Sequence, residues 1–134
     1  MILQVGVKVI LKNKDNKYLL LKRSKRYPDA QFKWDIAGGR INTGSSLIDN
    51  LKREVKEETN LDLKKPVKLI GAQDILKSDK HIVRLTYLGK IEGEPKISDE
   101  HTDFRWFTKD EIEGLKPQEI DKYLKEILSA GLIE

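Results

Sequence analysis

Three glutamates, Glu54, Glu57 and Glu58, lie within the short stretch "REVKEE". Their i, i+3, i+4 spacing places them on one side of a helix, where like charges repel one another. Burying carboxylates without a partner costs free energy, so a strong cationic partner is expected. Two kinds of cationic partner are possible. One is the set of basic neighbours Lys52, Arg53 and Lys56. The other is a divalent cation, because Mg²⁺ typically binds one or two carboxylates, several waters and substrate phosphates.

The helix that carries these acids is predicted over residues 46–59. Its apolar stripe consists of Leu47, Ile48, Leu51 and Val55. On a helical wheel Glu58 lies about 20° from Leu47, inside that stripe, and the other two glutamates border it. Ser45 or Ser46 is the expected N-cap, Asp49 lies in the first turn, and Asn60 is the expected left-handed terminator.

Two glycines, Gly38 and Gly39, precede this helix at the end of a predicted strand. Glycine allows close approach of the backbone to a ligand and a positive φ. A pair of glycines alone is often only a turn. A strand, a glycine turn, a loop and an acid-bearing helix together are the parts of a compact metal and phosphate site.

The remaining elements must position these residues, and their patterns predict a mixed α+β domain with a sheet core, one central helix and one C-terminal helix. A hairpin is predicted from the period-2 segment 3–12, the turn 13–16 and the strand 17–23. The apolar centre of its second strand predicts that this strand is buried on both faces. A loop over 24–33 precedes a short strand at 34–39. Further strands are predicted at 66–76, 81–91 and 104–107, with a loop at 93–103. Thr108 and Glu111 match a capping box, and a last helix is predicted from Pro117 to Ala130, with Gly131 just past its end.

Composition limits the function classes. The chain of 134 residues fits one domain, with 38% hydrophobic and 36% charged residues and a net charge of +4. A basic excess this small does not indicate nucleic-acid binding by itself. Without cysteine there is no disulfide, thiolate zinc site or cysteine nucleophile, and two histidines make a histidine-rich zinc site unexpected. The apolar runs are too short to span a bilayer and the start does not resemble a signal peptide, so a cytoplasmic location is expected.

The stretch "GGRINTGSSLIDNLKREVKEETNL" resembles the signature of the Nudix hydrolase family. Gly39 opens the pattern, and the members that match in register are Arg53, Glu54, Val55, Glu57, Glu58 and Leu61. The early hairpin, the "WDIAGG" approach, the late "DEHTDFRWF" strand and the C-terminal helix extend the likeness over the whole chain. Two motif positions depart: Ser45 stands where the family has Glu, and Asn60 where it has Gly. Asn tolerates the left-handed conformation, whereas Ser45 removes a carboxylate that in the family supports the metal site and braces the loop to the helix.

The resemblance implies the Nudix fold, with a mixed β-sheet core sandwiched between the central catalytic helix and the C-terminal helix. It implies a Mg²⁺- or Mn²⁺-dependent hydrolase that cleaves a nucleoside diphosphate linked to another moiety. The metal ligands carried over by position are Gly38 (through its carbonyl), Glu54, Glu57, Glu58 and Glu100. Glu54 or Glu57 is the implied base, and Arg53 orients the carboxylates. Glu100 can also be a solvated loop acid.

Substrate residues are less defined. Arg23 and Lys22 end a strand from which they can reach phosphates or simply face solvent, and Gly39 allows close approach of a substrate. Aromatic residues, Trp34 among them, can stack on a base or fill the core. A nucleoside triphosphate, (d)NTP, is the favoured substrate. The alternatives are ADP-ribose or a nucleotide sugar, a dinucleoside polyphosphate, a low-activity nucleotide-binding module, and an RNA-directed role such as cap removal. Many family members dimerise, so a homodimer is a further expectation.

Overall fold

The computed structural model describes residues 1–25, 32–131 and 133. Along the chain the elements are β1 (Ile2–Lys12), β2 (Tyr18–Arg23), β3 (Trp34–Asp35), β4 (Ala37–Arg40), α1 (Leu47–Thr59), β5 (Lys64–Leu76), β6 (Lys80–Lys90), β7 (His101–Phe107), α2 (Lys109–Glu113) and α3 (Lys122–Ser129). None of the described helices is both long and apolar enough to cross a membrane.

Strand β1 organises the sheet. It pairs in parallel with β6 over residues 2–12 and antiparallel with β4 over residues 6–9. Only its last two residues pair with β2, which is flanked by β3 on one edge and β7 on the other. The predicted hairpin of β1 and β2 is confirmed, but the main partners of β1 are β4 and β6.

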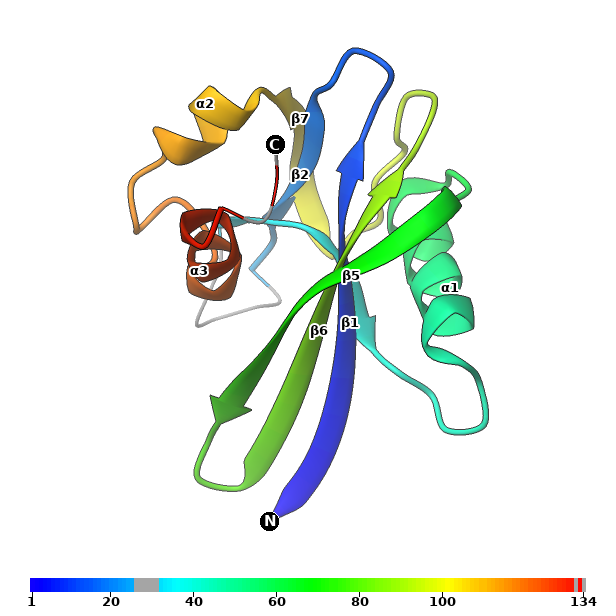
Figure 1. Cartoon of the computed structure of the whole chain (residues 1–134), viewed down its shortest axis with the longest axis vertical. Coiled ribbons are helices and arrows are strands. Elements are labelled where there is room, and N and C mark those ends of the chain that lie inside the picture. Colours follow the sequence, from blue (N-terminus) through cyan, green and yellow to red (C-terminus); the bar gives the residue numbers. More distant parts are fainter. Residues whose placement is uncertain (26–31, 132, 134) are drawn as a thin grey trace.

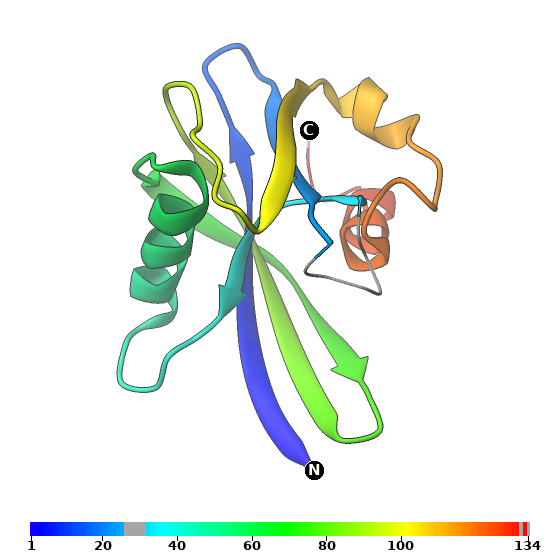
Figure 2. The same ribbon diagram turned by 180° about the vertical axis from the view of Figure 1, so that it is seen from behind.

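The mixed sheet lies between two helical layers, as the resemblance implies. Figure 1 shows α1 on one side of the strands and α2 with α3 on the other, and the view from behind agrees (Figure 2). Two buried clusters fill the two sides. The first includes Leu51 and Val55 of α1, and the second includes Leu124, Ile127 and Leu128 of α3.

Strand β2 contributes to both clusters, which confirms its predicted burial on both faces. Leu19 and Leu21 belong to the cluster under α1, whereas Tyr18 and Leu20 belong to the cluster under α3. Because successive side chains of a strand point to opposite faces, an apolar run of this kind suits a strand covered on both sides.

Helix α1 begins and ends as its sequence predicts. The Ser46 hydroxyl accepts the backbone N–H of Asp49, and Asn60 ends the helix in the left-handed conformation with φ 60°. Leu51 and Val55 are fully buried, but Leu47 is exposed, so its predicted place in the buried stripe is wrong. Ile48 of the same turn packs against the core, so the difference is limited to Leu47.

Two other boundaries differ from the prediction. The strand 34–39 is interrupted at Ile36, which separates β3, paired with β2, from β4, paired with β1. Strand β7 begins at His101 inside the predicted loop, because its pairing with β2 continues as far as Arg23. The predicted loop 24–33 lies largely outside the described residues.

The last helix starts later than predicted. Residues 119–121 run beside β3 instead, because the Trp34 N–H donates to the Glu119 carbonyl and the Asp121 N–H donates to the Trp34 carbonyl. Asp121 then caps α3 by accepting the N–H groups of Tyr123 and Leu124. Pro117 therefore precedes the helix by five residues and does not start it. Gly131, with φ 71°, follows the helix end as expected.

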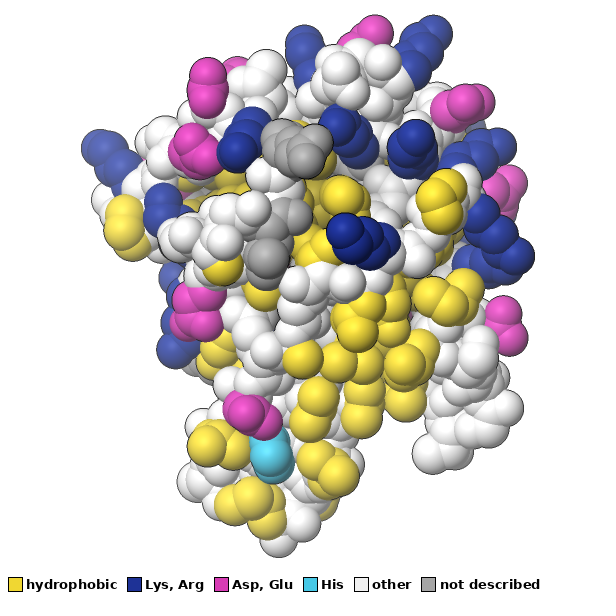
Figure 3. Space-filling model, in the orientation of Figure 1, with side chains coloured by type: hydrophobic (Ala, Val, Ile, Leu, Met, Phe, Trp, Pro, Cys, Tyr) yellow, Lys and Arg dark blue, Asp and Glu magenta, His cyan; other side chains and the backbone are white. Residues whose placement is uncertain are grey.

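The ends of β1, β5 and β6 extend away from the helices (Figure 1). Figure 3 shows hydrophobic side chains on the lower half of this face and mainly Lys and Arg on the upper half. The exposed large apolar residues Met1, Ile2, Leu3 and Leu76 belong to these strand ends. Basic side chains are thus concentrated near the helical part of the molecule on this face.

Candidate active site

An acidic cleft forms where α1 meets β4 and the start of β7. It has a volume of about 380 Å³, and Glu54, Glu58 and Glu100 contribute its carboxylates. Glu58 is only 4% exposed and accepts the Gly38 N–H at 2.8 Å. Ligand atoms of Glu58, Glu100 and His101 all lie within 4.8 Å of one another. The structure therefore brings together two of the predicted metal-ligand glutamates, with Glu54 in the wall of the same cleft.

Burial shifts the pKa values of three titratable groups in the cleft. Burial raises the pKa of Glu58 to about 8, although Lys8 and the hydrogen bond from Gly38 oppose the rise. Burial also raises the pKa of Glu54, against the lowering effect of Arg53. His101 is affected in the opposite way: burial and the charge of Lys8 lower its pKa to about 4, which keeps the ring neutral.

This donor set fits a divalent cation. Carboxylate oxygens are the ligands that Mg²⁺ and Mn²⁺ prefer, and a neutral imidazole nitrogen can also bind a metal. The buried Nδ1 atom of His101 has no hydrogen-bond partner among the described residues. A cation at this position would favour the ionised form of Glu58 and offset the cost of burying it.

Arg53 pairs with two glutamates at the outer side of the cleft. Its Nη1 donates to Glu54 at 2.9 Å and lies 3.4 Å from Glu57. The expected pairing of the acids with Arg53 is thus present for these two glutamates, whereas Lys56 lies 3.5 Å from Asp62 instead. The Glu57 side chain is 58% exposed and does not line the cleft. Its roles as base and metal ligand remain predictions.

A buried amide connects the preceding loop to α1. The Asn50 Oδ1 atom accepts the Asn42 N–H at 2.8 Å and Nη2 of Arg53 at 3.1 Å. Its Nδ2 donates to the carbonyls of Ser45 and Ser46 at 3.2 and 2.8 Å. This side chain braces the loop to the helix in a chain whose motif position 45 has no carboxylate.

Both glycines are required by close contacts. A Cβ on Gly38, whose φ is 140°, would lie 2.0 Å from the Val7 carbonyl oxygen, so a side chain would disrupt the pairing of β4 with β1. A Cβ on Gly39 would lie 2.8 Å from the Glu54 carboxylate. The absence of a side chain at Gly39 therefore leaves Glu54 its position in the cleft.

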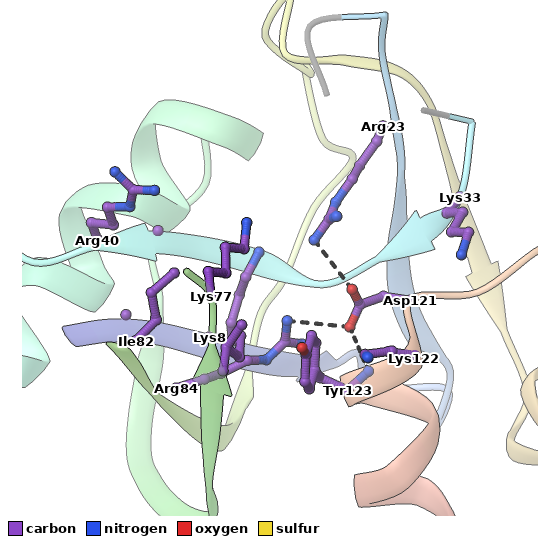
Figure 4. Close-up of a pocket in the computed structure, with 13 residues that line it drawn as sticks. Lys8, Arg23, Lys33, Arg40, Lys77, Ile82, Arg84, Asp121, Lys122 and Tyr123 are labelled. Carbon is purple, nitrogen blue, oxygen red and sulfur yellow. Dashed lines mark hydrogen bonds and ion pairs between the residues drawn. The ribbon is translucent and has the colours of Figure 1, made fainter. Parts of the chain in front are cut away.

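A second, basic pocket adjoins the acidic cleft. It has a volume of about 490 Å³ and lies between the sheet and the start of α3 (Figure 4). Both cavities are lined by Lys8, Arg23, Gly39 and Arg40, which form a shared wall. The two cavities are therefore neighbours at these four residues.

Buried ion pairs form the floor of the basic pocket. Arg23 and Arg84 point toward Asp121, at 3.4 and 3.2 Å (Figure 4). The same two arginines and Lys8 also pair with Asp35. Burial alone would raise the pKa of the Asp35 carboxyl, but the three cations hold it well below its usual range. Three cations thus share two carboxylates.

The predicted substrate residues have different outcomes. Arg23 and Gly39 line both cavities, in keeping with a place beside a substrate. Trp34 is only 7% exposed and packs edge to face on Phe107, with ring centroids 5.2 Å apart. It belongs to the core and does not line either cavity, so the structure does not support its use for base stacking.

Sequence reasoning missed Lys8, Asp35, Arg84 and Asp121 as site residues, and it did not place His101 in the cleft. A signal was present for the first three, since each is a charged residue inside an otherwise apolar strand. Buried charges are rare unless they are paired, so three such residues in three strands indicate a shared network. Asp121 carries no comparable signal.

Comparison with known proteins agrees with this geometry. The family profile of the NUDIX domain matches residues 2–129. None of the curated proteins searched matches the sequence.

Solved structures with the same fold come from several organisms. A MutT NUDIX hydrolase from Burkholderia pseudomallei is 26% identical, with 96% of this chain and 98% of that chain covered and a TM-score of 0.81. A MutT protein from Bacillus halodurans is 27% identical over 98% of this chain and 83% of that one, with a TM-score of 0.77. A MutT protein from Methanosarcina mazei Go1, 24% identical over 96% and 92% of the two chains, has a TM-score of 0.82 and shows the shared fold. With the acidic helix, the glycine turn and the profile match in agreement, the chain belongs to the Nudix hydrolase family.

Proposed function

We propose that the protein is a metal-dependent hydrolase that cleaves the pyrophosphate bond of a nucleoside diphosphate linked to another moiety, with a (d)NTP as the favoured substrate. The observation that carries this proposal is the shared wall between the acidic cleft and the basic pocket. An acidic site for a cation directly beside a cationic cavity suits a phosphate chain with an organic group at its end.

The cation-holding residues would be Glu58 and Glu100, with Glu54 and His101 beside them. Gly38, through its carbonyl, and Glu57 complete the set that the family pattern implies. When bound, Mg²⁺ or Mn²⁺ neutralises phosphate charge and polarises the P–O bonds. Lys8, Arg23 and Arg40 add fixed positive charge along the wall where the phosphates would lie.

Glu54 is the proposed base. Its carboxylate lines the cleft, is held by Arg53, and has a pKa raised by burial, which brings it closer to neutral pH. It would take a proton from a water that attacks phosphorus, as the P–O bond to the bridging oxygen breaks. The products are two phosphorylated molecules, and one proton is released.

Chromatographic separation of the phosphorylated products from a nucleotide panel tests the proposal. The panel contains dNTPs, ADP-ribose, a GDP-sugar, a dinucleoside polyphosphate and capped RNA, each with Mg²⁺, Mn²⁺ or EDTA. Turnover should require the metal and fall about 10²- to 10⁴-fold in Glu54→Gln. Glu94→Gln, an exposed glutamate outside the acidic cleft, is the matched control.

Two results would contradict the proposal. Equal turnover in EDTA would show that the reaction needs no metal ion. Full activity of Glu54→Gln would show that Glu54 is not the base. If nucleotides bind but none is cleaved, the protein is a nucleotide-binding module instead. A cytoplasmic location, a single domain and a homodimer remain predictions beside this function.

A further inference from the structure

The basic pocket contains more positive charge than its own acids balance. Of the thirteen described residues that line it, seven are Lys or Arg and one is acidic. Lys8, Arg23 and Arg84 belong to the ion-pair network with Asp35 and Asp121 described above. The four remaining cations are Lys33, Arg40, Lys77 and Lys122.

These four side chains come from different parts of the chain. Lys33 precedes β3, Arg40 ends β4, Lys77 follows β5, and Lys122 starts α3. None of them makes an ion pair with a residue that the structure describes. The fold thus gathers uncompensated positive charge around one cavity of about 490 Å³.

Among the described residues that line this pocket, hydrogen-bond acceptors are scarce. The Asp121 carboxylate is occupied by Arg23, Arg84 and the N–H groups of Tyr123 and Leu124. Arg84 is only 4% exposed, and its Nε donor has no partner among the described residues. A ligand that fits this pocket must therefore supply acceptors.

A phosphate group meets these requirements better than a neutral group does. Lys33 is partly buried, and Arg40, Lys77 and Lys122 are exposed around the pocket. A cavity lined by one sign of charge raises the local concentration of ligands of the opposite sign. Arg and Lys are the side chains that bind phosphate, and their mutual repulsion falls when a dianion lies between them. A neutral sugar or base alone would leave the four cations without a counter-charge.

We propose that the basic pocket binds a phosphate group that the substrate carries in addition to its reactive diphosphate. The substrate class is then a nucleotide derivative with a further phosphate, on its ribose or at the end of a longer phosphate chain. This inference rests on the proposed hydrolase function and refines its substrate.

Matched pairs that differ by one phosphate test it. The substrates are ADP-ribose and its 2′-phosphate, dephospho-coenzyme A and coenzyme A, and ADP and ATP. In at least one pair, the member with the additional phosphate should have a kcat/KM about tenfold higher, and the advantage should shrink as salt is added. In the double variant Lys77→Ala with Lys122→Ala, the ratio of the two kcat/KM values within a pair should fall close to one. Lys68→Ala, which removes an exposed charge outside the pocket, should keep it.

Binding measured without turnover separates this inference from the hydrolase function. The ligands are AMP and three partners with one more phosphate: adenosine 2′,5′-bisphosphate, adenosine 3′,5′-bisphosphate and ADP. Suppose that no substrate is cleaved, that a partner binds about tenfold tighter than AMP, and that the double variant loses this preference. The phosphate site is then supported and the hydrolase function is contradicted. Cleavage with equal kcat/KM within all three substrate pairs would overturn the phosphate site alone. Without cleavage, equal affinity for AMP and all three partners would overturn both.

Discussion

At the scale of single residues, Asn50 connects the loop before α1 to the residues of the acidic cleft. Its side chain makes four hydrogen bonds inside this corner of the molecule. One of them binds Arg53, which in turn donates to Glu54. We expect Asn50→Asp to lower kcat about tenfold or more, with a smaller change in KM. The new carboxylate has no N–H to donate and would repel the carbonyls of Ser45 and Ser46.

The measurement is steady-state kinetics beside urea unfolding. Loss of a buried hydrogen-bonded amide should also lower the free energy of unfolding by about 1–3 kcal/mol. Asp49→Asn, a change at the exposed neighbouring position, is the control for altered charge at this end of the helix. If Asn50→Asp retains full kcat while its stability falls, Asn50 supports the fold only and does not position Arg53.

At the scale of elements, the start of α3 depends on Asp121. Its carboxylate caps the helix and pairs with two buried or half-buried arginines. Asp121→Ala should lower the free energy of unfolding by about 3–5 kcal/mol, because breaking a buried pair leaves uncompensated charge. Thr108→Ala, which removes the cap of α2 without any ion pair, should cost only about 1 kcal/mol.

Chemical denaturation of both variants checks this difference. Asp121→Asn keeps a capping oxygen and removes the charge, so it should fall between wild type and Asp121→Ala. Equal losses for Asp121→Ala and Thr108→Ala would show that the ion pairs contribute nothing beyond the cap.

The elements also show how far the sequence allows prediction. Helix α1, its caps and its acidic face were predictable because each signal lies within a few residues of the structure it specifies. The parallel pairing of β1 with β6 and the late start of α3 were not, since both depend on contacts between residues about 80 apart in the chain. The network of Lys8, Asp35 and Arg84 was not predicted for the same reason. The three charges are visible in the sequence, but the pairing of distant strands brings them into contact.

At the scale of the whole molecule, stability should depend on pH through Glu58. Burial raises its pKa in the folded protein to about 8, whereas the unfolded chain has an ordinary value near 4.5. The folded state therefore binds an additional proton between these two values. The stability from neutral Glu58 is fully present below about pH 4.5 and is lost as pH rises through about 8. Metal-free protein should thus become less stable from about pH 5 to about pH 8, by about 2 kcal/mol after relaxation of the site.

Denaturation curves between pH 5 and pH 8, in EDTA and in Mg²⁺, test this prediction. Glu58→Gln cannot ionise, so its curve should lack the decline that wild type shows in EDTA. Mg²⁺ should also reduce the decline in wild type, because a metal binds the ionised carboxylate and its affinity rises with pH. Parallel pH profiles of wild type and Glu58→Gln in EDTA would contradict the raised pKa. A profile that is insensitive to Mg²⁺ would instead show that the cation does not bind at Glu58.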